Sequence, residues 1–144
     1  MTAGDGPVVT RLGSGGPWEA RYGYSRVVRA GQLAITAGCT ATVDGRVVHV
    51  GDPAAQTAQA LRIGLAALAE VGAGPADVVR TRMYVTDRSH ADEVGRAHNA
   101  VFGAVRPVAT MVVVAGLIDP EHLVEVELEA YLPEGKDAPR DHQS

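Results

Sequence analysis

The sequence has little of what marks several classes of protein. Its single cysteine, Cys39, cannot form an internal disulfide, which disfavours a secreted scaffold held together by disulfides. No run reaches the ~18 apolar residues of a membrane-spanning helix. The N-terminus has neither the basic start nor the apolar stretch of a signal peptide. We therefore expect a cytoplasmic protein with no membrane partner.

Positive charge is also scarce. Thirteen lysines and arginines stand against seventeen aspartates and glutamates, which gives a formal net charge of −4. Proteins that bind nucleic acid carry a basic patch or stripe, so no nucleic-acid partner is predicted. The five histidines lack the spacing of roughly three to five residues that is common in zinc sites, and there is no second cysteine. The sequence therefore predicts no metal site.

The remaining composition is that of one domain. With 144 residues, of which 46% are hydrophobic and 21% charged, the chain is long enough to bury a hydrophobic core. Both ends have little apolar content, which predicts a flexible N-terminal lead over residues 1–20 and a disordered C-terminal tail over residues 134–144. The predicted domain covers residues 21–133.

Hydrophobic periodicity predicts an α+β fold. A helix is expected over residues 52–72, because Asp52 can cap it, Pro53 suits its first position and Gly72 suits the residue beyond its end. A second helix is expected over residues 89–102. Strands are expected over residues 21–29, 32–38, 43–50, 78–86, 109–115 and 123–132. This order predicts a mixed β-sheet with two helices packed on one face.

The last predicted strand alternates strictly between apolar and acidic residues. Residues 124, 126, 128, 130 and 132 are apolar and share one face, whereas Glu125, Glu127 and Glu129 share the other. One interpretation is a solvated sheet face with counter-charge from Arg80 and Arg82 on an adjacent strand. The other is that one glutamate lines a cleft, where it moves protons or positions a water molecule.

Cys39 also has two interpretations. It follows a predicted strand end, where a thiol with a lowered pKa could act as a nucleophile. Free cysteine is among the most buried residue types, so the alternative is a small buried hydrophobe.

Several motifs follow one another in a recognisable order. Tyr24-Ser25-Arg26 precedes a hairpin glycine, and Thr36-Ala37-Gly38 ends the next strand. Residues 77–81 and 84–87 read Asp-Val-Val-Arg-Thr and Tyr-Val-Thr-Asp, and residues 124–130 read Val-Glu-Val-Glu-Leu-Glu-Ala. In order and spacing, these motifs resemble those of the Rid family, also called the YjgF/YER057c/UK114 family, across residues 21–132.

The resemblance implies a chorismate-mutase-like fold and a homotrimer with a central barrel-like core, whose ligand pockets lie in the clefts between subunits. Well-known members hydrolyse reactive imines and enamines, such as 2-aminoacrylate, to the 2-keto acid and ammonia without a cofactor, so no cofactor is expected. The family's water-positioning carboxylate corresponds to Glu127, and Tyr24 would bound the pocket, so these two are the expected catalytic residues. The expected substrate-binding residues are Gly38, Cys39, Ala109, Thr110 and Met111.

One departure from the family pattern concerns substrate binding. In well-known members, an arginine in a Pro-Ala-Arg motif binds the substrate carboxylate, which a bidentate guanidinium suits. Counting back from Leu117 places Ala109 at the position of that arginine. The chain thus resembles an arginine-lacking branch of the family. The loss of such a clamp costs ~2 to 5 kcal/mol of binding, so we expect little 2-aminoacrylate deaminase activity.

Three functions stay open at this point. The first is an enzyme that acts on a small imine, enamine or activated carbonyl compound. The second is a pathway-specific biosynthetic enzyme that catalyses a cyclisation, dehydration or tautomerisation. The third is a non-catalytic trimer that binds a metabolite. RNA cleavage, also ascribed to the family, is disfavoured by the acidic charge balance.

Overall fold

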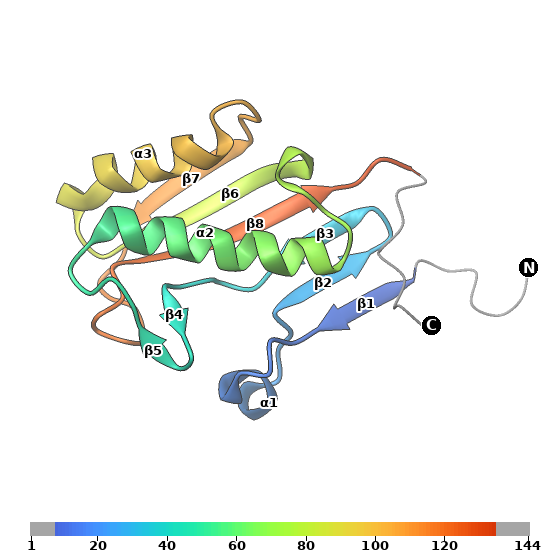
Figure 1. The fold of residues 1–144 in the computed structure, drawn as a ribbon, viewed down its shortest axis with the longest axis horizontal. Helices are drawn as coiled ribbons and strands as arrows, with labels where there is room; N and C mark the ends of the chain where they lie inside the picture. The colour runs from blue at the N-terminus through green and yellow to red at the C-terminus, as the bar shows by residue number, and fades with distance from the viewer. Residues whose placement is uncertain (1–7, 135–144) are drawn as a thin grey trace, which may run out of the picture.

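A six-stranded sheet is the centre of the fold. The computed structural model describes residues 8–134, and the strands of the sheet lie in the order β1-β2-β3-β8-β6-β7 (Figure 1). The parallel pair is β6 and β7, and the other neighbours are antiparallel. The strands are β1 (Val9–Leu12), β2 (Val27–Ala30), β3 (Leu33–Thr36), β6 (Val78–Val85), β7 (Val108–Val113) and β8 (Val124–Tyr131). The predicted mixed sheet is confirmed.

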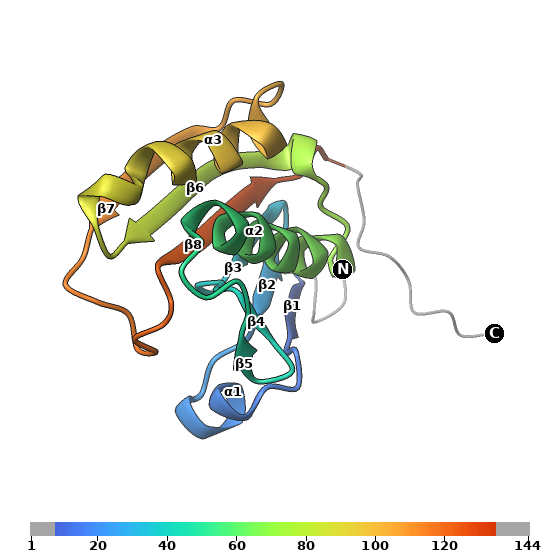
Figure 2. The ribbon, with the colours of Figure 1, turned by 60° about the vertical axis from the view of Figure 1, so that its left-hand side comes forward.

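Two long helices cover one face of this sheet. Figure 2 shows α2 (Pro53–Glu70) and α3 (Ala91–Phe102) on the same side of the strands. As predicted, Asp52 caps α2 by accepting a 3.0 Å hydrogen bond from the Ala55 N–H, and Gly72 beyond its end has a positive φ of 91°. The short 3-10 helices η1 (Pro75–Asp77) and η2 (Arg88–His90) precede β6 and α3, and a separate hairpin joins β4 (Thr42–Val43) to β5 (Arg46–Val47). The opposite sheet face is left open by the described residues.

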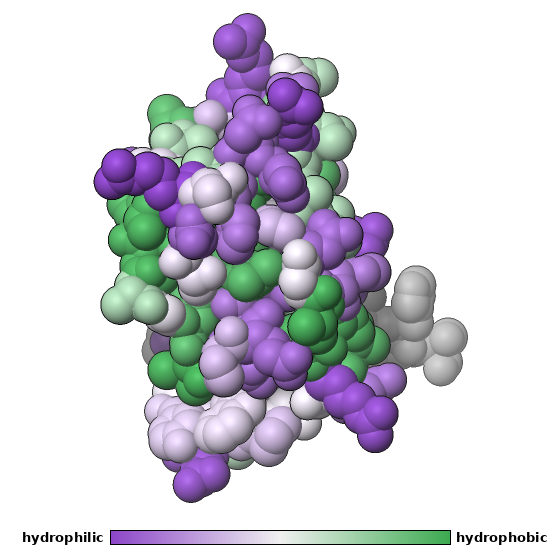
Figure 3. Space-filling view, turned by 90° about the vertical axis from the view of Figure 1, so that its left-hand side faces the viewer, coloured by the Kyte–Doolittle hydropathy of each residue, from purple (hydrophilic) through white to green (hydrophobic). Residues whose placement is uncertain are grey.

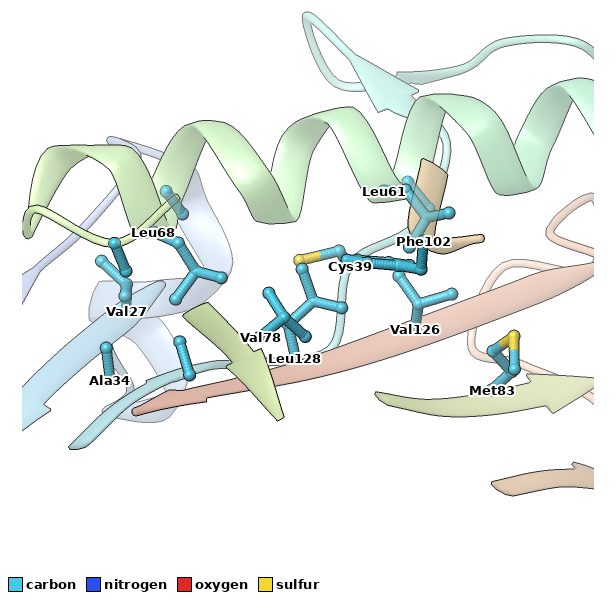
Figure 4. Close-up of a cluster of buried hydrophobic side chains, with 14 of the residues drawn as sticks. Val27, Ala34, Cys39, Leu61, Leu68, Val78, Met83, Phe102, Val126 and Leu128 are labelled. Atoms are coloured by element: carbon cyan, nitrogen blue, oxygen red, sulfur yellow. The ribbon is translucent and has the colours of Figure 1, made fainter. Parts of the chain in front are cut away.

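The core lies between the helices and the sheet. Val124, Val126, Leu128 and Ala130 all point toward the helices and are fully buried, which confirms the predicted alternation along β8. A Cβ atom at Gly64 of α2 would lie 2.8 Å from the Leu128 side chain, so only glycine lets the helix approach this closely. Figure 4 shows this contact region, where side chains from α2 and β8 meet.

The predicted flexible lead over residues 1–20 is wrong where the structure describes it. Residues 9–12 form β1, which pairs with β2, and α1 (Pro17–Tyr22) follows directly. Glu19 of α1 is buried and accepts hydrogen bonds from the Ser14 N–H at 2.8 Å and the Ser14 hydroxyl at 2.6 Å. Backbone pairing and one buried carboxylate order this segment, so its low apolar content does not make it flexible. Helix α1 also shortens the strand predicted from residue 21, since β2 begins at Val27.

A buried glutamine fixes the entry to β8. The Gln56 side chain is fully buried on α2 and donates hydrogen bonds to the carbonyls of His49 and Glu121. Its carbonyl oxygen accepts a 2.8 Å hydrogen bond from the Leu123 N–H, one residue before β8 begins. Helix α2 therefore holds two loops in place, and the second loop sets where the acidic strand starts.

The described surface is chemically mixed at the end where α2, α3 and β8 begin. Hydrophobic and hydrophilic side chains lie next to each other on this end of the molecule (Figure 3). Within residues 8–134, no helix is both long and apolar enough to span a membrane. The first seven residues of the predicted lead lie outside the described residues. Of the predicted tail over residues 134–144, the structure describes Glu134.

Candidate active site on the open sheet face

The open face carries a ladder of charged residues. In the antiparallel pairing of β8 with β6, Glu129 lies opposite Arg80 and Glu127 lies opposite Arg82. Arg82 Nη1 is 3.1 Å from a Glu129 oxygen, and Arg80 Nε is 3.8 Å from the other. The predicted counter-charge from Arg80 and Arg82 is therefore confirmed. A β-bulge at Val79 keeps both arginines on this face.

Glu127 is held by two neighbours on β6. The Tyr84 hydroxyl donates a hydrogen bond to its Oε1 atom, and Arg82 Nη1 lies 4.0 Å from its Oε2 atom. This hydrogen bond, together with burial and the charge of Glu127, raises the pKa of Tyr84. A phenol that stays protonated is a permanent donor, so the Glu127 carboxylate has a fixed orientation on the open face.

Glu125 has different surroundings on the same strand. Its carboxyl group lies against Gly38, where a Cβ atom would come within 2.7 Å of Glu125 Cδ. Burial raises the pKa of Glu125, the neighbouring Glu127 charge raises it further, and Arg26 opposes both. Only a glycine at position 38 leaves room for the carboxyl group in this place.

Arg26 links several predicted site residues. Its Nη1 atom donates a 2.6 Å hydrogen bond to the Gly38 carbonyl and lies 3.8 Å from the Cys39 sulfur. Its guanidinium also lies 5.8 Å from the centre of the Tyr24 ring, within cation–π range. On its other side, Arg26 Nε contacts the buried Glu19 at 3.4 Å. The structure thus gathers Tyr24, Gly38 and Cys39 around one arginine.

The Cys39 side chain is part of the core. It is 1% exposed, and its sulfur would lie 3.5 Å from a Cβ atom at Gly64. Burial raises the pKa of the thiol, against the opposing effects of Arg26 and Thr36. These observations favour the small buried hydrophobe over the nucleophile. The Cys39 backbone forms both hydrogen bonds of a bridge to Val126, so its structural role is to anchor the segment after β3 to β8.

The predicted substrate-binding residues of β7 divide between the two sheet faces. Ala109 is in register with Thr81, whose hydroxyl bonds His98 of α3 at 2.8 Å, so Ala109 points to the helix side. Met111 shares that side and packs against the core. Thr110 lies next to Arg82 on the open face. A residue at position 109 and Glu127 therefore face opposite sides of one subunit.

The two predicted catalytic side chains have different partners within one chain. Glu127 contacts Tyr84 and Arg82, whereas Tyr24 contacts Arg26. Sequence reasoning gave no role to the side chains of Tyr84 and Arg26, and it identified Glu125 only as one of three glutamates of which one could line a cleft. The alternation along residues 78–85 places Tyr84 on the acidic face and could have identified it. In the described residues, no group of three or more histidine, cysteine, aspartate or glutamate side chains could hold a metal ion.

The protein has an α+β fold, and a cluster of glutamate, arginine and tyrosine side chains lies on the sheet face that the described residues leave uncovered. Comparison with known proteins gives the family. Residues 17–132 match the family model described as Endoribonuclease L-PSP. An uncharacterised protein of Streptomyces coelicolor is 46% identical over 123 residues, which cover 85% of this chain and 92% of that protein.

Solved structures agree with this match. Rv2704 of Mycobacterium tuberculosis, described as a member of the highly conserved YjgF/YER057c/UK114 family, is 49% identical, with a TM-score of 0.79 over 87% of this chain and 100% of that one. NMB1025 of Neisseria meningitidis, a YjgF family member, is 27% identical, with a TM-score of 0.70 over 87% of this chain and 95% of that one. The chain belongs to the YjgF/YER057c/UK114, or Rid, family.

Proposed function

We propose that this protein is a cofactor-independent enzyme that acts on a small imine, enamine or activated carbonyl compound. The observation that carries the proposal is the Glu127 carboxylate, which Tyr84 and Arg82 hold on a sheet face open to ligands. A carboxylate in a fixed orientation can accept a proton from an attacking water molecule. Glu127 is the water-positioning residue in this scheme, and Tyr24 bounds the pocket.

The substrate differs from that of a standard 2-aminoacrylate deaminase. Ala109 stands where well-known family members have the arginine that binds the substrate carboxylate. A methyl group cannot replace a bidentate guanidinium, so the preferred substrate lacks a carboxylate at that position. A pathway-specific reaction on such a compound, for example a cyclisation or tautomerisation, uses the same groups.

The site is proposed to form between subunits of a homotrimer. Glu127 and position 109 face opposite sides of one sheet, so a pocket lined by both needs residues from two copies of the chain. The open face also exposes apolar side chains, with Leu33 at 40%, Ile35 at 37% and Tyr131 at 54% exposure. Apolar surface next to charged groups is typical of interaction sites, and a second copy would cover it.

Turnover of an imine panel tests the proposal. The panel pairs amino-acid-derived imines that carry an α-carboxylate with matched imines that lack it. We expect wild type to hydrolyse the second group, Ala109→Arg to gain activity on the first, and Glu127→Gln to abolish both. Val113→Arg is the matched control, because it adds the same charge on the same face of β7 at an exposed position.

The outcomes separate the proposal from its alternatives. Turnover of 2-aminoacrylate by wild type at the rate of arginine-containing relatives would contradict the substrate assignment. If no variant consumes any substrate, a metabolite-binding trimer becomes the better account. RNA added as a further substrate tests the activity named in the family model's description, and the net charge of −4 predicts no cleavage.

A further inference from the structure

Two adjacent carboxyl groups of β8 have unlike environments. Glu127 accepts a hydrogen bond from Tyr84 and lies near Arg82, as described above. Glu125, two residues earlier, is partly buried, yet its carboxyl group has no hydrogen bond or ion pair within the described part of the chain. A carboxylate withdrawn from water without a partner is unfavourable, whereas a carboxylic acid is not.

The groups that face Glu125 favour a bound proton. On its own strand the nearest charge is the Glu127 carboxylate, which repels a second negative charge. On β6, Tyr84 lies in register with Glu125, but its hydroxyl is donated to Glu127. On the β2–β3 side lie Arg26 and the Cys39 thiol, and Arg26 is already engaged with the Gly38 carbonyl and with Glu19. Burial and repulsion therefore outweigh the pull of Arg26.

We propose that Glu125 is the acid of this site, holding a proton that it delivers to the substrate nitrogen, while Glu127 accepts a proton from the attacking water. The proposal rests on the proposed function and deepens it by dividing the proton transfers between two named residues. Paired carboxyl groups with different environments are a common way to supply an acid and a base at neutral pH.

The proton balance closes without a cofactor. Glu125 first protonates the imine nitrogen, which makes the carbon more electrophilic. Water then attacks that carbon as Glu127 removes one of its protons, giving a carbinolamine. Glu127 passes its proton to the amine nitrogen, the C–N bond breaks, and ammonia leaves. The hydroxyl proton of the resulting protonated carbonyl returns to Glu125. One imine and one water become one carbonyl compound and one ammonia, and both carboxyl groups are restored.

The chemistry also defines the substrate class. An acid that delivers a proton to nitrogen suits a neutral imine, which must be protonated before water attacks. A substrate that already carries a permanent iminium charge has no use for this proton. Glu125→Gln should therefore slow hydrolysis of a neutral imine and leave hydrolysis of an N,N-dialkyl iminium ion almost unchanged.

A direct titration tests the proton on Glu125 without any substrate. Carbon-13 NMR of protein labelled at the glutamate side-chain carboxyl carbons, with Glu125→Gln to assign the signal, gives the pKa. We expect Glu125 to titrate above the usual carboxyl range. Gly38→Ala should return its pKa toward the ordinary value, because the new methyl group displaces the carboxyl group into solvent. An ordinary pKa in wild type overturns the proposal.

Kinetics of matched variants complete the test. On a neutral imine, loss of the acid should lower kcat by about 100-fold or more in Glu125→Gln and remove the alkaline limb of the pH profile. Glu93→Gln is the control and should stay within about threefold of wild type, because Glu93 is exposed on α3 and lies outside the acidic cluster of β8. Turnover by Glu125→Gln at the wild-type rate and pH profile overturns the acid assignment alone. A raised Glu125 pKa with no turnover by wild type instead shows that the proposed function has failed, and the acid role with it.

Discussion

The two faces of β8 share one backbone, but one carries buried apolar side chains and the other carries acidic side chains. Toward the helices, Val124, Val126, Leu128 and Ala130 are completely buried, and their side chains contribute hydrophobic contact. Toward the open face, Glu129 and Glu127 contact arginines or a tyrosine, whereas Glu125 has no hydrogen bond or ion pair within residues 8–134. Close packing stabilises the face of β8 toward the helices. On the open face, the three glutamates have different neighbours, so they can take different chemical roles. The two faces should therefore respond to mutation in different ways.

The largest effect on stability is expected on the helix side. Leu128→Ala removes a fully buried side chain beneath α2 and should lower the free energy of unfolding by ~2 to 5 kcal/mol. Glu129→Ala, one residue along, should cost under about 1 kcal/mol, because its ion pairs with Arg80 and Arg82 are half-exposed. Urea denaturation measures both. Equal losses for the two variants would mean that the open face is stabilised as strongly as the core.

An intermediate effect, with a characteristic pH dependence, is expected for Glu125→Gln. Folding raises the pKa of Glu125, so the folded protein favours the protonated form. The favourable contribution of Glu125 to the free energy of unfolding is fully present below its pKa in the unfolded chain, about 4.3. This contribution is lost as pH rises through the pKa of the folded protein. Glutamine cannot ionise, so the variant should gain stability relative to wild type between about pH 4 and neutrality.

Thermal denaturation across this pH range measures the effect, which solvent screening keeps under about 1 kcal/mol. Glu129→Gln is the matched control on the same face, and the loss of its half-exposed ion pairs should change the free energy of unfolding by under about 1 kcal/mol. A stability difference between Glu125→Gln and wild type that does not vary with pH would show that Glu125 is fully solvated in the folded protein.

The sequence predicted the helix side of the fold well. A period of two along β8 and spacings of three and four in α2 depend on burial, which residue type records directly. The N-terminal segment was mispredicted for a physical reason. Strand β1 adds to the sheet by backbone hydrogen bonds, and α1 depends on one buried carboxylate, Glu19, so neither needs an apolar run.

The candidate site was predicted less completely. The pattern placed three glutamates on one face and proposed Arg80 and Arg82 as partners, which the β6–β8 register confirms. Which glutamate meets Tyr84 and which lies against Gly38 depends on long-range register, and local periodicity does not encode it. The same limit applies to Ala109, whose position on the helix side follows from its pairing with Thr81.

The smallest effect on stability, and the most specific, is expected at Tyr84. Its hydrogen bond to Glu127, burial and the Glu127 charge raise the pKa of the phenol. Glu127→Gln removes the charge and should therefore lower the pKa of Tyr84, while the free energy of unfolding changes little. Absorbance titration of the tyrosines follows this change, and Tyr84→Phe identifies the signal by deleting it. The side chain of Glu125 lies on the same face, but it has no hydrogen bond to Tyr84, so Glu125→Gln should move this titration less than Glu127→Gln. An equal shift from both variants would show that the two carboxyl groups titrate as one coupled pair. That result would contradict the assignment of separate roles to Glu127 as the base and Glu125 as the acid.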